Sequence, residues 1–265
     1  MVTHQYSMTS VAPTVSAVLG LPAPAQAIGE PIETIVQGLA GVKRVAVIAP
    51  DALGLFAVNL WRSEMPYLHS ELAKNQVTLR SVLPSITPVN FACMVTGTDR
   101  DGHGIHSFRH DFGCQTLFDV VRESGGRSAG VGFDGYTGAE LLGRFADIKG
   151  NVSLGSDEAI AERVAEIGRT AKPQFIIAQL GRVDDVFHEH GPSSPEVVPM
   201  LRDTDARLKR MVNELTPRGY GVIILADHGQ HDVLDALPGQ HKGNHGTDSD
   251  EDCLVPCTWA RRSLD

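Results

Sequence analysis

Three short apolar runs, each followed closely by an aspartate, constrain the fold of this chain more than any other feature. The runs are RVAVIA at 44–49, FIIAQL at 175–180 and GVIILA at 221–226. They are short and lack helical spacing, which favours strands buried on both faces. Helical patterns lie between them. The sequence therefore predicts an α/β fold, with a mostly parallel central sheet and helices on both faces.

Other segments continue this alternation. Residue spacing predicts helices at 65–74, 88–95, 117–123, 157–169 and 195–215, and extended segments at 77–83 and 127–133. No stretch with the composition of a linker divides the chain. We expect one catalytic domain at 44–265, with residues 1–43 as an N-terminal arm packed on it.

Composition narrows the range of partners. The 265 residues carry a net charge of -9, which argues against a stable nucleic-acid partner held in a basic groove. No apolar run reaches the ~18 residues of a membrane span. The N-terminal stretch has no Lys or Arg before Lys43, unlike a signal peptide, and the four cysteines form no CxxC pair. We therefore expect free thiols and a cytoplasmic protein.

The carboxylates after the three apolar runs indicate a metal site. Ligands bind beyond the carboxyl ends of parallel strands, so Asp51, Asp184 and Asp227 should meet at one end of the sheet. Histidines follow closely, at i+4 from Asp184 (His188), next to Asp227 (His228) and in the glycine-flanked GNHGT segment (His245). A mixed carboxylate and imidazole set suits zinc, with manganese or iron as alternatives.

A candidate nucleophile precedes the helix predicted at 88–95. Thr87 is followed by Pro88, which places its hydroxyl at the N-cap of that helix. Helix N-termini favour anions such as phosphoryl groups, and a nearby cation can activate a hydroxyl for attack. The alternative is that Thr87 only caps the helix.

These segments, in this order, resemble the alkaline phosphatase superfamily, in particular its type I phosphodiesterase/nucleotide pyrophosphatase-like branch. The matching pieces span roughly residues 44–256 and are PDALG, PSITPVNFACMVTGTDRDGHGI, VDDVFHEHGP, ADHGQ and GNHGT. The resemblance implies two divalent cations and a phospho-threonine intermediate on Thr87, with Asn90 binding a phosphoryl oxygen. One cation would be held by Asp184, His188 and His245, and the other by Asp51, Thr87, Asp227 and His228.

The chain departs from that branch at three places. Ala52 follows Asp51 where the branch usually has glycine, and Pro88 follows Thr87 where nucleotide-cleaving members usually have an aromatic residue. Only sixteen residues separate His228 from His245, which leaves no room for a large cap domain. We expect an alkaline phosphatase-like core with an open site, or one covered by the N-terminal arm or by a second subunit of a homo-oligomer.

The expected activity is metal-dependent hydrolysis of a small-molecule phosphoester, with phosphodiester or pyrophosphate bonds first. A phosphomonoesterase or a phosphonate hydrolase of the phosphonoacetate type is the alternative. An isomerase of the cofactor-independent phosphoglycerate mutase type would need a serine nucleophile and a large inserted domain, and the chain has neither. A non-catalytic metal-binding relative is the remaining alternative, although no ligand position of the pattern is lost.

Overall fold

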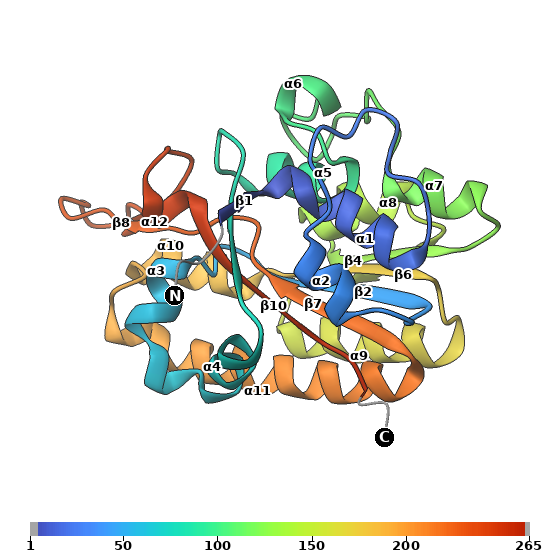
Figure 1. The fold of residues 1–265 in the computed structure, drawn as a ribbon. Coiled ribbons are helices and arrows are strands. Elements are labelled where there is room, and N and C mark those ends of the chain that lie inside the picture. Colours follow the sequence, from blue (N-terminus) through green and yellow to red (C-terminus); the bar gives the residue numbers. More distant parts are fainter. Residues whose placement is uncertain (1–4, 263–265) are drawn as a thin grey trace.

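A computed structural model describes residues 5–262 and is built on a central sheet of eight strands (Figure 1). The strand order is β1-β3-β10-β7-β2-β6-β4-β5, and only β10 runs against the others. The strands are β1 (Gln5–Ser7), β2 (Arg44–Pro50), β3 (Val77–Arg80), β4 (Ser128–Phe133), β5 (Ile148–Val152), β6 (Phe175–Leu180), β7 (Tyr220–Leu225) and β10 (Leu254–Ala260). The predicted mostly parallel sheet is confirmed.

Helices cover both faces of this sheet, as the sequence predicts (Figure 1). One face carries α1 (Val11–Leu19), α2 (Glu33–Gly38), α5 (Thr87–Thr96) and α7 (Leu117–Glu123). The other carries α4 (Pro66–Lys74), α9 (Asp157–Thr170) and α11 (Val198–Leu215). The central strands β2, β6 and β7 are almost wholly buried between these layers, which explains their continuous apolar sequences.

Residues 5–43 contribute to both the sheet and the core. Strand β1 pairs in parallel with β3 at one edge of the sheet, and Met8, Ala12 and Val15 are fully buried. Residues 1–4 of the predicted arm lie outside the described residues. A domain boundary after residue 43 stays a prediction.

Strands β1, β5 and β10 and helix α1 are among the elements that the sequence patterns do not predict. Strand β1 has only three residues, β5 contains Gly150 and Asn151, and β10 contains Pro256. These residues are depleted in strands, so propensity alone argues against the assignment. Helix α1 (VAPTVSAVL) is apolar on almost all sides because most of it is buried, and it therefore lacks an amphipathic period.

The segment between His228 and His245 is a short hairpin rather than a domain. Its strands are β8 (His231–Asp232) and β9 (Gly243–Asn244), which pair antiparallel. No large cap is inserted at this point, in agreement with the sequence prediction. No helix among residues 5–262 is long and apolar enough to cross a membrane.

Candidate active site

The predicted ligand residues meet where three neighbouring strands end. Strands β7, β2 and β6 lie side by side and run in the same direction, so their carboxyl ends share one end of the sheet. Asp51 directly follows β2, and Asp227 follows β7 after one residue. Helix α10 (Arg182–His190) begins just after β6 and carries Asp184 in its first turn. Sheet topology thus collects residues that are up to 176 positions apart in the sequence.

The first ligand group consists of Asp184, His188 and His245. Asp184 and His188 face each other one turn apart on α10, with Oδ1 and Nε2 separated by 3.4 Å. His245 approaches from the loop after β9 and places its Nε2 3.6 Å from the same carboxylate oxygen. The three side chains are 13–19% exposed, so solvent reaches this group.

The second ligand group consists of Asp51, Asp227 and His228, and it is buried. His228 Nε2 lies 3.2 Å from Asp227 Oδ2 and 3.6 Å from Asp51 Oδ1. Asp227 Oδ1 accepts a 3.2 Å hydrogen bond from the backbone N–H of Ala52, but the buried Oδ2 has no hydrogen-bond partner among the described residues. A buried carboxylate oxygen without a donor is the environment that a cation satisfies.

All three histidines point Nε2 at the carboxylates and Nδ1 at a backbone carbonyl. The pairs are His188 with Gly243 at 2.9 Å, His228 with Gly229 at 3.0 Å and His245 with Ser85 at 3.0 Å. A carbonyl oxygen only accepts, so Nδ1 carries the proton and Nε2 keeps its lone pair. This is how metal-ligating histidines are usually held. Each group therefore offers three donor atoms that fit a divalent cation such as zinc.

Thr87 lies against the buried group. Its Oγ1 is 3.1 Å from His228 Nε2 and donates a 3.4 Å hydrogen bond to Asp51 Oδ1. The prediction that Thr87 is the N-cap of its helix was wrong by one position, because Ile86 is the N-cap and α5 begins at Thr87. The Thr87 hydroxyl contacts Asp51 and His228, so it is available at the site.

Asn90 makes other contacts than the one that the resemblance implies, and its phosphoryl role stays a prediction. The sequence resemblance implies that its amide binds a phosphoryl oxygen, whereas the structure buries it completely. Its Oδ1 accepts from the Val82 N–H at 2.8 Å, and its Nδ2 donates to the carbonyls of Val82, Pro84 and Ile86. The amide faces the loop before Thr87 because it satisfies backbone groups that would otherwise be unpaired. Asn90 thus positions this loop rather than contacting the ligand groups.

Two glutamines that the sequence analysis did not single out hold the carboxylates in place. Gln179 in β6 donates its amide to Asp51 Oδ2 and accepts from the Gly138 N–H at 2.6 Å. Gln230 donates to Asp184 Oδ1 at 2.6 Å. Gln179 left a signal in the sequence, since it is the one polar residue in the run FIIAQL. Its partner, 128 residues away, could not be predicted from that signal.

Ala52 occupies a backbone conformation that favours glycine. Its φ is +62°, in the left-handed region, and its N–H donates to Asp227. The turn after Asp51 needs this conformation, because it directs the Ala52 N–H at the Asp227 carboxylate. The departure from the Asp-Gly pattern therefore changes the residue but keeps the turn.

Burial sets the electrostatics of both groups. It raises the pKa of Asp51, with further contributions from the charges of Asp227 and Asp184, and it raises the pKa of Asp227 to about 7. Burial also lowers the pKa of His228 and brings that of His245 to about 4, with His228 as a second cause for His245. Neutral imidazoles are ready to bind a cation. The carboxyls need one nearby before they ionise readily.

Comparison with known sequences identifies a related family. The profile of type I phosphodiesterase / nucleotide pyrophosphatase matches residues 129–247. This range contains the whole first ligand group together with Asp227 and His228, whereas Asp51 and Thr87 precede it. No curated protein sequence matches the chain.

Solved structures share the fold at low sequence identity. Murine ectonucleotide pyrophosphatase / phosphodiesterase 5 superposes with a TM-score of 0.66 and 15% identity, over 81% of this chain and 87% of the other. An inactive threonine-to-alanine variant of it, in complex with AMP, gives the same TM-score at 14% identity. Phosphonoacetate hydrolase from Sinorhizobium meliloti, in complex with phosphonoacetate, gives 0.56 at 20% identity, over 73% of this chain and 58% of that enzyme.

Proposed function

We propose that this chain, a type I phosphodiesterase/nucleotide pyrophosphatase-like member of the alkaline phosphatase superfamily, hydrolyses phosphodiester or pyrophosphate bonds with Thr87 as nucleophile. One observation carries the proposal. The Thr87 hydroxyl, at the start of α5, lies 3.1 Å from His228 within a site that also offers two sets of three metal-ligating atoms. A hydroxyl used only for helix capping would have no reason to lie there.

The two ligand groups fit two divalent cations. We propose zinc first, because each group mixes imidazole nitrogen with carboxylate oxygen, and manganese or iron as alternatives. When bound, the two cations would supply positive charge that favours ionisation of the nucleophile and offsets charge on the departing oxygen. The unpartnered Oδ2 of Asp227 and the lone pairs of the three histidine Nε2 atoms support this loading.

The chain's own residues define a two-step displacement. The Thr87 oxygen bonds to phosphorus while the bond to the leaving group breaks, and the leaving group takes the electron pair and, in the overall balance, the proton that the Thr87 hydroxyl loses. Water then cleaves the phospho-threonine and returns a proton to Thr87. The first backbone N–H groups of α5, a ten-residue helix, are suited to orient the phosphoryl oxygens.

A phosphoester with one negative charge suits this site best. A phosphomonoester dianion would favour a fixed protein cation, and Arg182 is the nearest arginine in the sequence motifs. Its guanidinium binds Asp185 at 2.6 Å, and Asp185 also accepts from the Tyr136 hydroxyl. No Lys or Arg side chain among residues 5–262 forms an ion pair with a member of either ligand group. This charge pattern supports a diester or an internal pyrophosphate.

The second candidate is a phosphonate hydrolase, because the fold is also shared with phosphonoacetate hydrolase. A metal-loaded preparation should be tested with bis-p-nitrophenyl phosphate, p-nitrophenyl phosphate and phosphonoacetate. We expect the diester to have the highest kcat/KM. A tenfold preference for the monoester, about 1.4 kcal/mol in transition-state free energy, would transfer the proposal to phosphomonoesterase. Preference for phosphonoacetate would transfer it to phosphonatase.

We propose a cytoplasmic location on the basis of the cysteines. All four are free, and Cys93, Cys253 and Cys257 are buried. Free thiols support a reducing cytoplasm. A small-molecule phosphoester is the proposed partner, and a homo-oligomer is one way in which the open site could be covered.

A further inference from the structure

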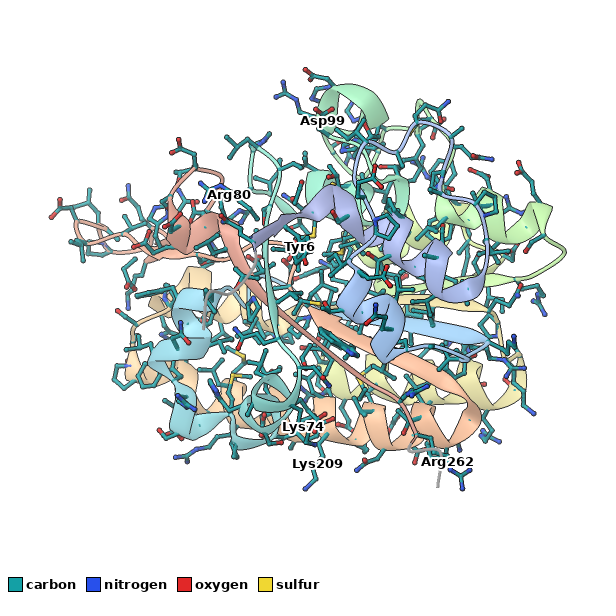
Figure 2. All side chains as sticks on the ribbon, in the orientation of Figure 1. Tyr6, Lys74, Arg80, Asp99, Lys209 and Arg262 are labelled. Atoms are coloured by element: carbon teal, nitrogen blue, oxygen red, sulfur yellow. The ribbon has the colours of Figure 1, made fainter. Side chains whose placement is uncertain are left out.

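A basic pocket lies at the end of the strands opposite the candidate active site. It has a volume of about 290 Å³ and is formed where β2 and β7 begin and where β10 ends. Four cationic side chains line it: Lys43, Arg44, Arg261 and Arg262. Figure 2 shows Arg262 at the lower right of the molecule, and Figure 1 shows α10 at its left side. Strands β2 and β7 span six or seven residues, so roughly 20 Å separates this pocket from the ligand groups.

The charges of the basic pocket are not neutralised by the described chain. No Asp or Glu lines the pocket, and none of its four cations forms an ion pair with any residue in 5–262. The whole chain has a net charge of -9, so carboxylates are plentiful elsewhere. Clustered positive charges repel each other. Because the described residues supply no carboxylate for these four cations, the pocket is suited to an external anion.

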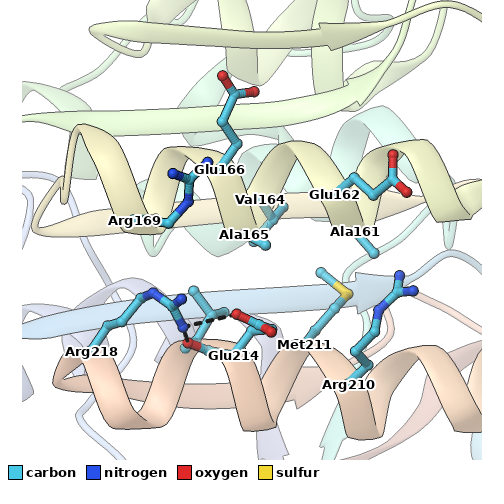
Figure 3. A pocket seen from close by; sticks show the side chains of 11 residues that line it. Ala161, Glu162, Val164, Ala165, Glu166, Arg169, Arg210, Met211, Glu214 and Arg218 are labelled. Carbon is cyan, nitrogen blue, oxygen red and sulfur yellow. Dashed lines mark hydrogen bonds and ion pairs between the residues drawn. The ribbon is translucent and has the colours of Figure 1, made fainter.

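A groove of similar size shows the contrast. It lies between α9 and α11, has a volume of about 300 Å³ and is lined by three arginines and three glutamates (Figure 3). There Arg218 pairs with Glu214 at 2.9 Å, and Arg210 pairs with Glu158. That groove is balanced within the chain and gives no preference for an anionic ligand. The basic pocket, in contrast, favours an anionic ligand.

Backbone carbonyls hold two of the guanidinium groups in the basic pocket. Arg44 Nε donates to the Lys172 carbonyl at 3.2 Å, and Arg261 Nη1 donates to the Ala40 carbonyl. The remaining N–H groups of each guanidinium are left for a ligand. Gly41 and Gly219 form part of the lining with φ of +86° and +83°, so the loops turn tightly without side chains that would close the opening.

We propose that the basic pocket binds a small anion that bears a phosphate group, either inorganic phosphate or a nucleoside monophosphate. Guanidinium forks match phosphate oxygens in pairs, and four cations suit a dianion better than a single carboxylate. A pocket of this volume accommodates a phosphate with part of an attached group. The proposal does not depend on the catalytic one, because it uses no residue of the ligand groups.

The test compares three forms of the metal-loaded protein by isothermal titration calorimetry with inorganic phosphate and with AMP. The forms are wild type, the double variant Arg44→Gln/Arg261→Gln, and the control Arg127→Gln/Lys209→Gln. The control removes two exposed cations that do not line the pocket and form no ion pair. We expect one binding event to be lost, or its Kd to weaken at least tenfold, in the first double variant only.

Two further measurements keep the outcome interpretable. Unchanged thermal unfolding would show that both double variants fold, and unchanged kcat/KM on the diester substrate would separate this pocket from the catalytic site. A response to phosphate and AMP alike identifies the phosphate as the ligand, and a response to AMP alone identifies the nucleotide. Equal binding of both ligands by all three forms would overturn the proposal.

Discussion

The two ligand groups have the same chemistry but very different surroundings. The group of Asp51, Asp227 and His228 is 0–2% exposed, whereas the side chains of Asp184, His188 and His245 are 13–19% exposed. The buried group of Asp51, Asp227 and His228, described above as the second ligand group, follows the ends of two adjacent central strands. The exposed group of Asp184, His188 and His245, the first ligand group, lies on α10 and on the loop after β9.

This difference in burial should separate their roles. Two carboxylates buried together are costly unless a cation neutralises them, so the buried group should be unstable without metal and hold it tightly. Water partly solvates the other group, so its cation should exchange more easily. Thr87 contacts only the buried group among these ligands, which ties the nucleophile to the cation that exchanges less.

The largest expected effect comes from Thr87. Thr87→Ala removes the proposed nucleophile from the buried group and should lower kcat at least ~100-fold, more than one positioning contact usually contributes. Metal content, measured by plasma emission spectroscopy, should stay at the wild-type level because all six other ligands remain. Thr87→Ser, which keeps a hydroxyl, is the matched control and should retain much more activity. Activity within a few-fold of wild type in Thr87→Ala would remove Thr87 from the mechanism.

Replacing one carboxylate of each ligand group by an amide tests whether burial makes the two groups differ in their effect on stability. At pH 8 Asp227→Asn should abolish turnover but raise the melting temperature of the metal-free protein, because a neutral amide replaces a charge in the core. We expect a rise of at least ~3 °C, because each kcal/mol of unfolding free energy shifts the melting temperature of a protein of this size by about 2–4 °C. Burial raises the pKa of Asp227 to about 7 in the folded protein, whereas its ordinary value is about 4. The unfolded chain therefore ionises first as pH rises from about 4 to 7, and the folded wild type loses stability over this range. Below pH 4 the carboxyl is protonated in both states, so the stabilisation by Asp227→Asn should vanish.

Asp184→Asn is the control for Asp227→Asn. Its carboxylate is 16% exposed, so its replacement should leave the metal-free melting temperature within about 1 °C of wild type. Equal shifts in the two variants, measured by calorimetry, would show that burial does not distinguish the groups.

The smallest expected effect is the number of protons released when zinc binds. At pH 6 the metal-free Asp227 is mostly protonated, whereas His245, with a pKa of about 4, is already neutral. Zinc must displace the carboxyl proton but none from His245, so binding at pH 6 should release about one proton or more, and fewer at pH 8. Zinc affinity should therefore fall as pH drops through 7. Calorimetry in buffers of different ionisation enthalpy measures the release, and Asp227→Asn should reduce it.

The sequence predicts the site well where chemistry and topology coincide. The three apolar runs indicated buried strands, and the aspartates after them came together because parallel neighbouring strands end at the same side. His188 and His228 followed from their closeness to those aspartates along the chain, and His245 from its glycine-flanked segment GNHGT. The resemblance to the family supplied the partition into two groups, and the structure brings the same residues together.

Contacts that depend on the path of the folded chain could not be read from the sequence. The partners of Asn90 are backbone groups of a loop whose path is set by the fold, so the predicted phosphoryl contact could not be checked against them in advance. Gln179 reaches Asp51 only because β6 and β2 are neighbours. The basic pocket combines the start of two strands with the end of a third, and no local pattern marks that combination.

Anomalous scattering from crystals of the zinc-loaded protein tests the central claim most directly. We predict two ions roughly 4 Å apart, the separation typical of two-metal hydrolases. One should contact Asp51, Asp227 and His228, and the other Asp184, His188 and His245. On brief exposure to a chelator, the ion at the buried group should be the last to leave, and turnover should be lost. A single ion bound only at the exposed group, or full activity in excess chelator, would contradict the two-metal account.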